Sequence, residues 1–374
     1  MNEPVKIKVK RKLLSSALDK TSLSLPAGKT TYPYLSQVLL EYNNEKIKLT
    51  ATDLKKAITT SVLYNCESEG SILFPGKLVS DVLRKLYDEE VSLFLNNNQL
   101  ILKTDKSSFS FQLMSVEEFP IIPFAEDTRE LKINQSVLST ILKQGLFSAS
   151  RDIEREGLSG ALLTNNKNLF RVVSTDGHRL SIGEGELISF PSQNLNAMIS
   201  AADLRLVEFL NSGEDISIRW DQKQVDFIQG NTHMTFKLLG AKFPPYEEVI
   251  PRSCTTILNI KTQPLTQSLD RLTTLNQHEP IKFSVGDILT LTVNVAGVGE
   301  GVETVDAVEF TGNKLDVFIN PRYFIEALKN SISDTLFFGF NSSQSPILIT
   351  NQKIPKADDL VGGYYLALIM PMQI

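Results

Sequence analysis

KRKLLSSALDKTSLS, residues 10–24, is an amphipathic segment whose pattern occurs three times in the chain. Comparable helical segments begin at residues 134 and 261, so the successive starts lie 124 and 127 residues apart. A regular spacing of this size indicates a repeated structural unit. We therefore expect each third of the chain to adopt the same fold.

A second helical segment also recurs, at 76–88, 201–212 and 320–330. The apolar side chains of its first copy form one stripe, at Leu78, Val79, Val82, Leu83 and Leu86. This spacing is typical of a helix packed against a sheet. Between and after the helices the chain alternates apolar and polar residues and is broken by polar turns, as strands and hairpins do. Each third is thus predicted to run helix, strands, helix, strands.

Two short motifs repeat with the same period. TATD at 50–53 matches VSTD at 173–176, and EFPIIP at 118–123 matches FPPYEEVIP at 243–251. These matches predict an α+β protein of three repeated domains, each with two helices packed on antiparallel sheets. The predicted domains are 1–127, 128–251 and 252–374.

Composition places the chain among ordinary globular proteins, with 374 residues, 42% apolar and 22% charged. Cys66 and Cys254 lie far apart without zinc-ligand spacing, and both are expected to be buried structural thiols. The sequence contains no run of 18 apolar residues and no secretory pattern at its start. A cytoplasmic location is the expectation.

Charge is divided between the helices and the rest of the chain. The formal net charge is −5, yet the six helical segments together carry +7, which leaves −12 elsewhere. Helices packed side by side are about 8–10 Å apart, so twelve helices from two chains could surround an opening of roughly 21–28 Å. Such an opening admits duplex DNA, whereas six helices from one chain would leave almost none. A solvated basic helix face, without DNA, is the alternative interpretation of the same charges.

STDGHRL at 174–180, FPPYEEVIP at 243–251, LIMPMQI at 368–374 and the period of about 124 together resemble the bacterial sliding clamp family, the beta subunits of DNA polymerase III. The resemblance spans the whole chain. It implies a head-to-tail homodimer that forms a six-domain ring around double-stranded DNA, without sequence specificity. It further implies a DNA polymerase processivity factor with neither catalytic activity nor cofactor. The implied partners are a clamp loader, the replicative polymerase's catalytic subunit, and other polymerases and repair proteins that carry a clamp-binding peptide.

The resemblance also assigns site residues. Its partner-peptide groove between domains 2 and 3 corresponds to Leu158, Thr175, Gly177, His178, Arg179, Leu180, Pro244, Val249, Met370, Pro371 and Met372. Motif matches and helix placement assign DNA-facing roles to Lys10, Lys12, Lys29, Lys77, Arg84, Lys143, Arg151 and Arg205. The dimer seam is expected to place Phe109 and Phe111, on an edge strand, against Leu275.

Some positions depart from the family pattern. Glu248 and Gln373 occupy positions that are often basic in relatives, so the rim of the groove is expected to be less positive. Ala201 and Ala202 replace residues that are basic and DNA-facing in some relatives.

The terminal segment combines two roles. Met370 and Met372 suit an adaptable groove wall, because methionine fills irregular gaps. Leu366 and Leu368 are predicted to belong to the core instead.

Asp176, His178 and Arg179 lie within four positions, which raises the alternative of a hydrolase with His178 as general base. No GxSxG, HExxH or phosphate-binding glycine loop accompanies them. Asp53 lies at the matching place in the first third, without a histidine nearby. We therefore favour a turn aspartate, with His178 and Arg179 supporting a surface groove. A further alternative is a monomeric binding module that does not encircle DNA.

Overall fold

The computed structural model describes residues 5–28, 30–64, 68–95, 98–125, 129–191, 193–353 and 365–373. These residues form two compact units. Unit 1 comprises residues 1–132 and 206–238, and unit 2 comprises residues 133–205 and 239–374. Each unit thus combines one outer third of the chain with part of the middle third. The three domain boundaries given above stay a prediction.

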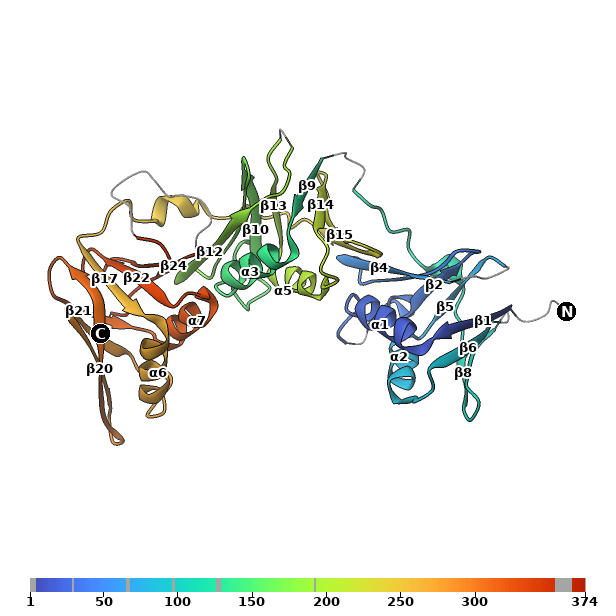
Figure 1. The fold of residues 1–374 in the computed structure, drawn as a ribbon, viewed down its shortest axis with the longest axis horizontal. Coiled ribbons are helices and arrows are strands. Elements are labelled where there is room, and N and C mark those ends of the chain that lie inside the picture. The colour runs from blue at the N-terminus through green and yellow to red at the C-terminus, as the bar shows by residue number, and fades with distance from the viewer. Residues whose placement is uncertain are drawn as a thin grey trace. The chain divides into compact units, whose positions relative to one another are not determined.

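Both helices predicted in each third are present (Figure 1). The first helices of the three repeats are α1 (Arg11–Ser22), α3 (Gln135–Leu146) and α6 (Thr262–Leu272). The second helices are α2 (Gly76–Lys85), α5 (Ala201–Leu204) and α7 (Pro321–Ser331). The short helical segments are η1 (Pro33–Ser36), η2 (Val116–Glu118), α4 (Glu156–Ser159), η3 (Arg205–Phe209) and η4 (Tyr246–Val249).

The middle repeat departs from the predicted 201–212 helix. Its α-helical part, α5, is only four residues long and continues as the 3₁₀ segment η3. The N–H of Leu210 donates to the carbonyl of Val207, three residues back, which is the tighter hydrogen-bond pattern of a 3₁₀ turn.

The described strands of unit 1 form a four-stranded sheet, β1-β6-β7-β8, and an eight-stranded sheet, β5-β2-β3-β4-β16-β15-β14-β9. Their bounds are β1 Val5–Lys10, β2 Val38–Tyr42, β3 Lys46–Thr52, β4 Lys56–Leu63, β5 Gly70–Phe74, β6 Glu90–Leu95, β7 Gln99–Lys103, β8 Ser108–Gln112, β9 Glu130–Ile133, β14 Ile216–Trp220, β15 Gln224–Gln229 and β16 Thr232–Lys237.

The described strands of unit 2 form one sheet, β13-β10-β11-β12-β24-β23-β22-β17-β20-β19-β18-β21. Their bounds are β10 Gly160–Asn166, β11 Leu169–Thr175, β12 Arg179–Glu186, β13 Asn196–Ser200, β17 Thr256–Lys261, β18 Ile281–Val285, β19 Ile288–Val295, β20 Gly299–Thr311, β21 Leu315–Ile319, β22 Thr335–Phe340, β23 Ile347–Thr350 and β24 Tyr365–Ile369.

Neighbouring repeats are joined through their sheets. Strand β4 of the first repeat pairs antiparallel with β16 of the middle repeat, and β12 of the middle repeat pairs with β24 of the third. In unit 1, α1 and α2 lie side by side (Figure 1). In unit 2, α3 contacts α7, which contacts α6. The continuation of one repeat's sheet into the next, on which the ring model depends, is thus present at both junctions.

The helices bury the apolar faces that the sequence indicated, with one correction. Val79 and Leu83 of α2 are buried against the sheets of unit 1, but Leu78 is 58% exposed. Val79 and Leu83 are four residues apart and therefore point from one face of the helix toward the sheet. Leu78 precedes Val79 by one residue, which turns its side chain toward solvent.

Helix α3 packs closely against its sheet. A Cβ added to Gly145 would lie 2.4 Å from the Val172 carbonyl oxygen, and one added to Gly183 would lie 2.3 Å from the Ile141 carbonyl oxygen. Glycine at both positions therefore allows α3 to lie directly on β11 and β12. Within the described part of the chain, no helix has the length and apolar character needed to cross a membrane.

Candidate partner-binding surface

The turn between β11 and β12, which we call the corner (residues 175–180), is held together by its own side chains. One Asp176 carboxylate oxygen accepts hydrogen bonds from the backbone N–H groups of His178 (2.9 Å) and Arg179 (3.0 Å). The Thr175 hydroxyl donates to the Arg179 carbonyl at 2.6 Å. Gly177 has a φ of 92°, a conformation that favours glycine. Asp176 therefore serves as a turn aspartate, as predicted.

The first repeat builds the same turn. Asp53 accepts from the N–H groups of Lys55 and Lys56, both at 2.9 Å, and the Thr52 hydroxyl donates to the Lys56 carbonyl at 2.7 Å. Leu54, at the place of Gly177, also has a positive φ, 74°. Because this turn forms without a histidine, its geometry belongs to the repeated fold. The arrangement gives no support to a hydrolase centred on His178.

The buried side chain of Arg179 stabilises the corner through contacts with Asp176 and with helix α7. This side chain is 7% exposed, and its guanidinium contacts Asp176 Oδ2 at 3.0 Å and Glu326 Oε2 at 2.5 Å. The same group lies over the Tyr323 ring, 4.3 Å from its centre. Both Tyr323 and Glu326 belong to α7, so Arg179 fastens the corner to a helix of the third repeat.

The pKa of Glu326 reflects this contact. Burial alone would raise that pKa, but the hydrogen bonds and charges of Arg179 and Arg322 lower it below its ordinary value of 4.5. Glu326 therefore stays ionised near neutral pH and keeps its attraction to Arg179.

Replacing Arg179 with alanine is expected to lower the free energy of unfolding by about 2–3 kcal/mol, because it removes the closest cation from two partly buried carboxylates, Asp176 and Glu326. The Glu326 contribution is present above its ordinary pKa and is lost as pH falls through the lower folded-state pKa. The stability difference between wild type and variant should therefore narrow below about pH 4.5. Urea unfolding at several pH values measures this difference.

Arg322→Ala is the matched control, because Arg322 contacts the same carboxylate at 3.3 Å but is 49% exposed. Its expected cost is below about 1 kcal/mol. Equal costs for the two variants would contradict the supporting role of Arg179.

The tail, residues 370–373, lies beside the corner. Strand β24 pairs with β12, with Arg179 opposite Ile369, and the N–H of Met370 donates to the His178 carbonyl at 2.9 Å. Met370 is 41% exposed, whereas Leu366 and Leu368 are buried. The predicted core role of those two leucines is thus confirmed.

The remaining predicted groove residues lie on neighbouring segments of unit 2. Val249, at the end of η4, is 52% exposed, and Pro244, Leu158, Pro371 and Met372 are partly exposed. A buried apolar cluster beneath them contains Leu180, Tyr246 and Leu368 and links the corner, η4 and the tail. The exposed members on which a partner could bind directly are therefore Gly177, His178, Val249 and Met370.

Sequence reasoning missed three side chains at this surface: Arg155, Tyr323 and Glu326. An Arg155 guanidinium nitrogen comes within 3.8 Å of the position where a Gly177 Cβ would lie. All three are distant from the corner in sequence, so no local motif could have indicated them. Glu248 and Gln373 are exposed, as a position on the rim requires.

The predicted DNA-facing residues differ in their surroundings. Lys10, Lys12, Lys77, Lys143 and Arg151 are exposed. Arg84 is exposed too but forms an ion pair with Asp19, and Arg205 donates to the Leu146 carbonyl at 3.0 Å. Lys29 and Cys66 lie outside the described residues. Cys254 is partly buried, and burial raises the pKa of its thiol to about 11.

The predicted seam residues occupy suitable places. Strand β8, which carries Phe109 and Phe111, lies at one edge of its sheet. Phe109 is 38% exposed, and Phe111 packs partly against the core of the first repeat. Leu275 follows α6 and packs partly against the core of the third repeat.

Comparison with known proteins decides the family. Models of the N-terminal, central and C-terminal domains of the DNA polymerase III beta subunit match residues 5–123, 132–245 and 247–364. The chain belongs to the DNA polymerase III beta subunit family. The three matches follow one another along nearly the whole chain and agree with the repeat inferred from the sequence.

Individual relatives are distant in sequence but match over nearly the full length. The beta sliding clamp of Synechococcus elongatus is 28% identical over 92% of this chain and 95% of its own. The beta sliding clamp of Chlamydia muridarum is also 28% identical, over 99% of both chains. The solved sliding clamp of Bacillus subtilis matches the fold with a TM-score of 0.91 at 22% identity, over 100% of both chains.

Proposed function

We propose that two copies of this chain close into a ring around duplex DNA and act as a processivity factor for DNA synthesis, in the cytoplasm and without catalysing a reaction themselves. The observation that carries this proposal is the junction of repeats through β4–β16 and β12–β24. Within each unit a sheet thus continues from an outer repeat into the middle repeat, as a ring built from repeats requires.

DNA would be held without reading its sequence. The exposed cations at the helices are lysines and arginines suited to phosphate oxygens, and phosphate contacts carry no base information. Retention would then come from enclosure by the ring, while electrostatic attraction contributes a component that salt weakens.

The seam would join two unpaired strand edges. Strand β8 pairs only with β7, and residues 299–306 of β20 pair only with β19 among the described strands. Exposed edges readily pair with another chain. A head-to-tail contact between these edges of two copies would close the ring and cover both.

Partners would bind through the corner, the tail and η4. The exposed Met370 and Val249 offer an apolar surface, and His178 adds a polar group beside it. We assign to this surface a short peptide segment carried by the replicative polymerase's catalytic subunit, the clamp loader and other DNA-processing proteins.

Primer extension on a primed circular template tests the proposal. With a bacterial replicative polymerase, a clamp loader and ATP, addition of this chain should lengthen the products made in a single binding event. Product lengths that do not change with any matched bacterial polymerase and loader would overturn it.

A further inference from the structure

The paired helices of the two outer repeats carry the same interhelical ion pair. In the first repeat Arg84 of α2 contacts Asp19 of α1 at 2.7 Å. In the third repeat Lys329 of α7 contacts Asp270 of α6 at 3.2 Å. Asp19 follows the buried Leu18, and Asp270 follows the buried Leu269, so the two aspartates occupy equivalent places on their helices.

The middle repeat has a lysine at this place. Lys143 follows the buried Leu142 on α3, as Asp19 follows Leu18 on α1. Its side chain is exposed and forms no ion pair with the described residues. Counted along the sequence, the residue that corresponds to Arg84 and Lys329 of the outer repeats is Phe209, which lies in the 3₁₀ segment η3 of the middle repeat. At this place the middle repeat thus has a cation without a counter-charge among the described residues. The outer repeats have an aspartate there, which neutralises a cation of the second helix.

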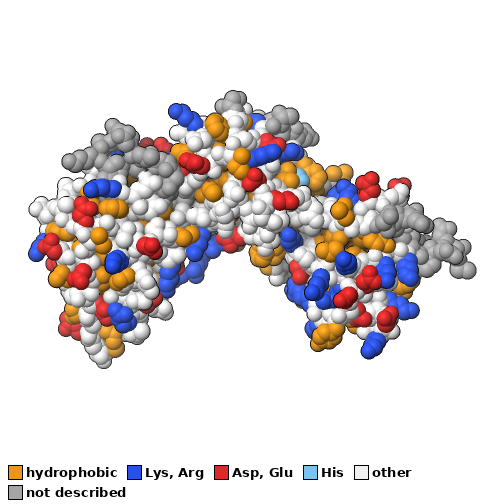
Figure 2. All heavy atoms as spheres, viewed as in Figure 1, with side chains coloured by type: hydrophobic (Ala, Val, Ile, Leu, Met, Phe, Trp, Pro, Cys, Tyr) orange, Lys and Arg blue, Asp and Glu red, His pale blue; other side chains and the backbone are white. Residues whose placement is uncertain are grey.

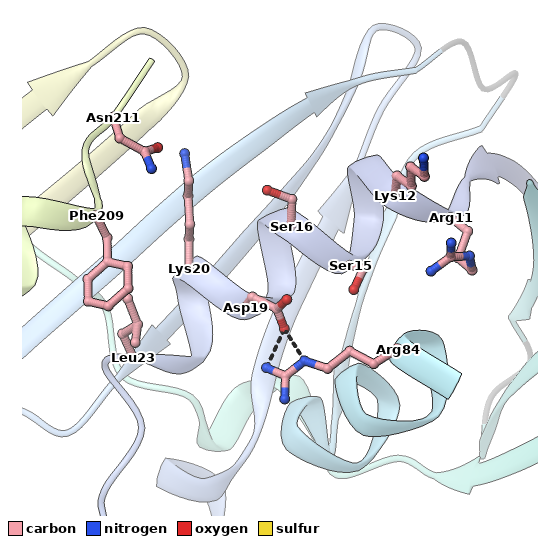
Figure 3. A pocket seen from close by; sticks show the side chains of 10 residues that line it. All are labelled: Arg11, Lys12, Ser15, Ser16, Asp19, Lys20, Leu23, Arg84, Phe209 and Asn211. Carbon is pink, nitrogen blue, oxygen red and sulfur yellow. Dashed lines mark hydrogen bonds and ion pairs between the residues drawn. The ribbon is translucent and has the colours of Figure 1, made fainter. Parts of the chain in front are cut away.

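A hollow of about 480 Å³ beside α1 shows how closely Arg84 is held (Figure 3). The Arg84 guanidinium turns toward Asp19, which it contacts through Nε at 3.1 Å and Nη2 at 2.7 Å. Asp19 also accepts from the Ser80 hydroxyl at 2.5 Å. Asp81 adds a second acidic group 3.5 Å from Arg84.

Arg11, on the same hollow, is also engaged. Its guanidinium donates to the carbonyl of Leu83 in α2 and to the carbonyl of Asp88, three residues beyond that helix. Lys12 and Lys20 form no ion pair with the described residues. Figure 2 accordingly shows Lys and Arg side chains interspersed with acidic ones over the part of unit 1 that carries α1 and α2. Two of the four basic side chains that line this hollow, Arg11 and Arg84, therefore already bind acceptors within the protein.

We propose that Asp19 and Asp270 are built-in counter-charges that weaken the attraction of the outer repeats for DNA phosphates, so that Lys143 and other unpaired lysines supply most of the electrostatic grip. This inference rests on the proposed function, because it takes the helices to face DNA. A phosphate oxygen that approaches Arg84 or Lys329 must compete with a carboxylate already in place. A weaker grip at these places favours movement along DNA over arrest at one position.

Binding to a short linear duplex, followed by fluorescence anisotropy over a series of salt concentrations, tests the inference. Asp19→Asn with Asp270→Asn should tighten binding at least roughly tenfold near 100 mM salt, because each released cation can take up a phosphate. The slope of log affinity against log salt should steepen by about 0.9 for each phosphate gained, up to about 3.6 for the four sites of a ring.

Glu41→Gln is the matched control. Glu41 forms an ion pair with Lys48 at 2.8 Å, and its side chain lies on the opposite face of β2 from Leu40 and Tyr42, which pack in the core with α1. Glu41→Gln removes one negative charge and releases one lysine, so its affinity is compared with that of the Asp19→Asn single variant. An equal gain in affinity with Glu41→Gln would overturn the proposal, because the gain would then reflect net charge alone.

Arg84→Ala gives a second test. In the wild type it should change the salt slope little, whereas Lys143→Ala should lower the slope by about 0.9 per protomer. In the Asp19→Asn background Arg84→Ala should reverse the gained slope. An unchanged slope in both aspartate variants, or equal losses for Arg84→Ala and Lys143→Ala in the wild type, would overturn the proposal.

Failure of the proposed ring is distinguished by a separate measurement. In that case the wild-type protein would be lost from closed circular DNA at high salt.

Discussion

Leu275→Asp is expected to convert the chain from a dimer into monomers that no longer stay on DNA. Leu275 is partly buried against the core of the third repeat and lies beside Gly301 of β20, next to the unpaired edge of residues 299–306. A carboxylate in this contact would lose water without gaining a partner. A cost of roughly 3–5 kcal/mol would weaken dimerisation by about 10²–10³-fold or more.

Light scattering after size exclusion measures the change. Leu63→Asp, at a leucine that is 86% exposed, introduces the same charge in β4, a strand that belongs to neither proposed edge, and should remain dimeric. Phe109→Asp, on the opposite edge, should reproduce the monomer. Because Leu275 also contacts its own core, circular dichroism must show that each variant is folded. Folded Leu275→Asp monomers that still support long synthesis would refute the ring account.

Met370→Ala combined with Met372→Ala is expected to weaken partner binding strongly while leaving the ring intact. A partner peptide that covers both side chains would bury apolar surface worth roughly 3 kcal/mol, so its affinity should fall about 100-fold. The backbone of the tail is held by hydrogen bonds from Met370 N–H to His178 and from Met372 N–H to Phe318, which alanine keeps.

Peptide affinity and primer extension together measure this effect. The double variant should remain on circular DNA but lose stimulation of the polymerase. Leu63→Ala, an exposed leucine of unit 1, should change neither quantity. Wild-type affinity of the double variant for a clamp-binding peptide would show that the tail is not part of the binding surface.

Much of the fold could be predicted because the same pattern occurs three times. The buried leucines at Leu14, Leu138 and Leu265 mark the same turn of each first helix, and the matching turns at Asp53 and Asp176 follow from short motifs. Periodicity and turn chemistry are local properties, so a sequence expresses them directly.

The supports of the site could not be predicted in the same way. Arg179 is joined to Glu326, 147 positions away, and Tyr323 stacks on it from another repeat. The pairing of Arg84 with Asp19 likewise depends on how α1 and α2 pack. Such contacts follow from tertiary structure, and the charge of a residue alone does not reveal whether it is already neutralised.

Retention on DNA of different topology tests the central claim most directly. The chain, loaded onto closed circular duplex and then washed at high salt, should remain bound, and it should be released when one cut makes the circle linear. Salt weakens phosphate contacts on both forms, but only a closed ring is held by the topology of the circle. Equal loss from circular and linear duplex under those conditions would contradict the account.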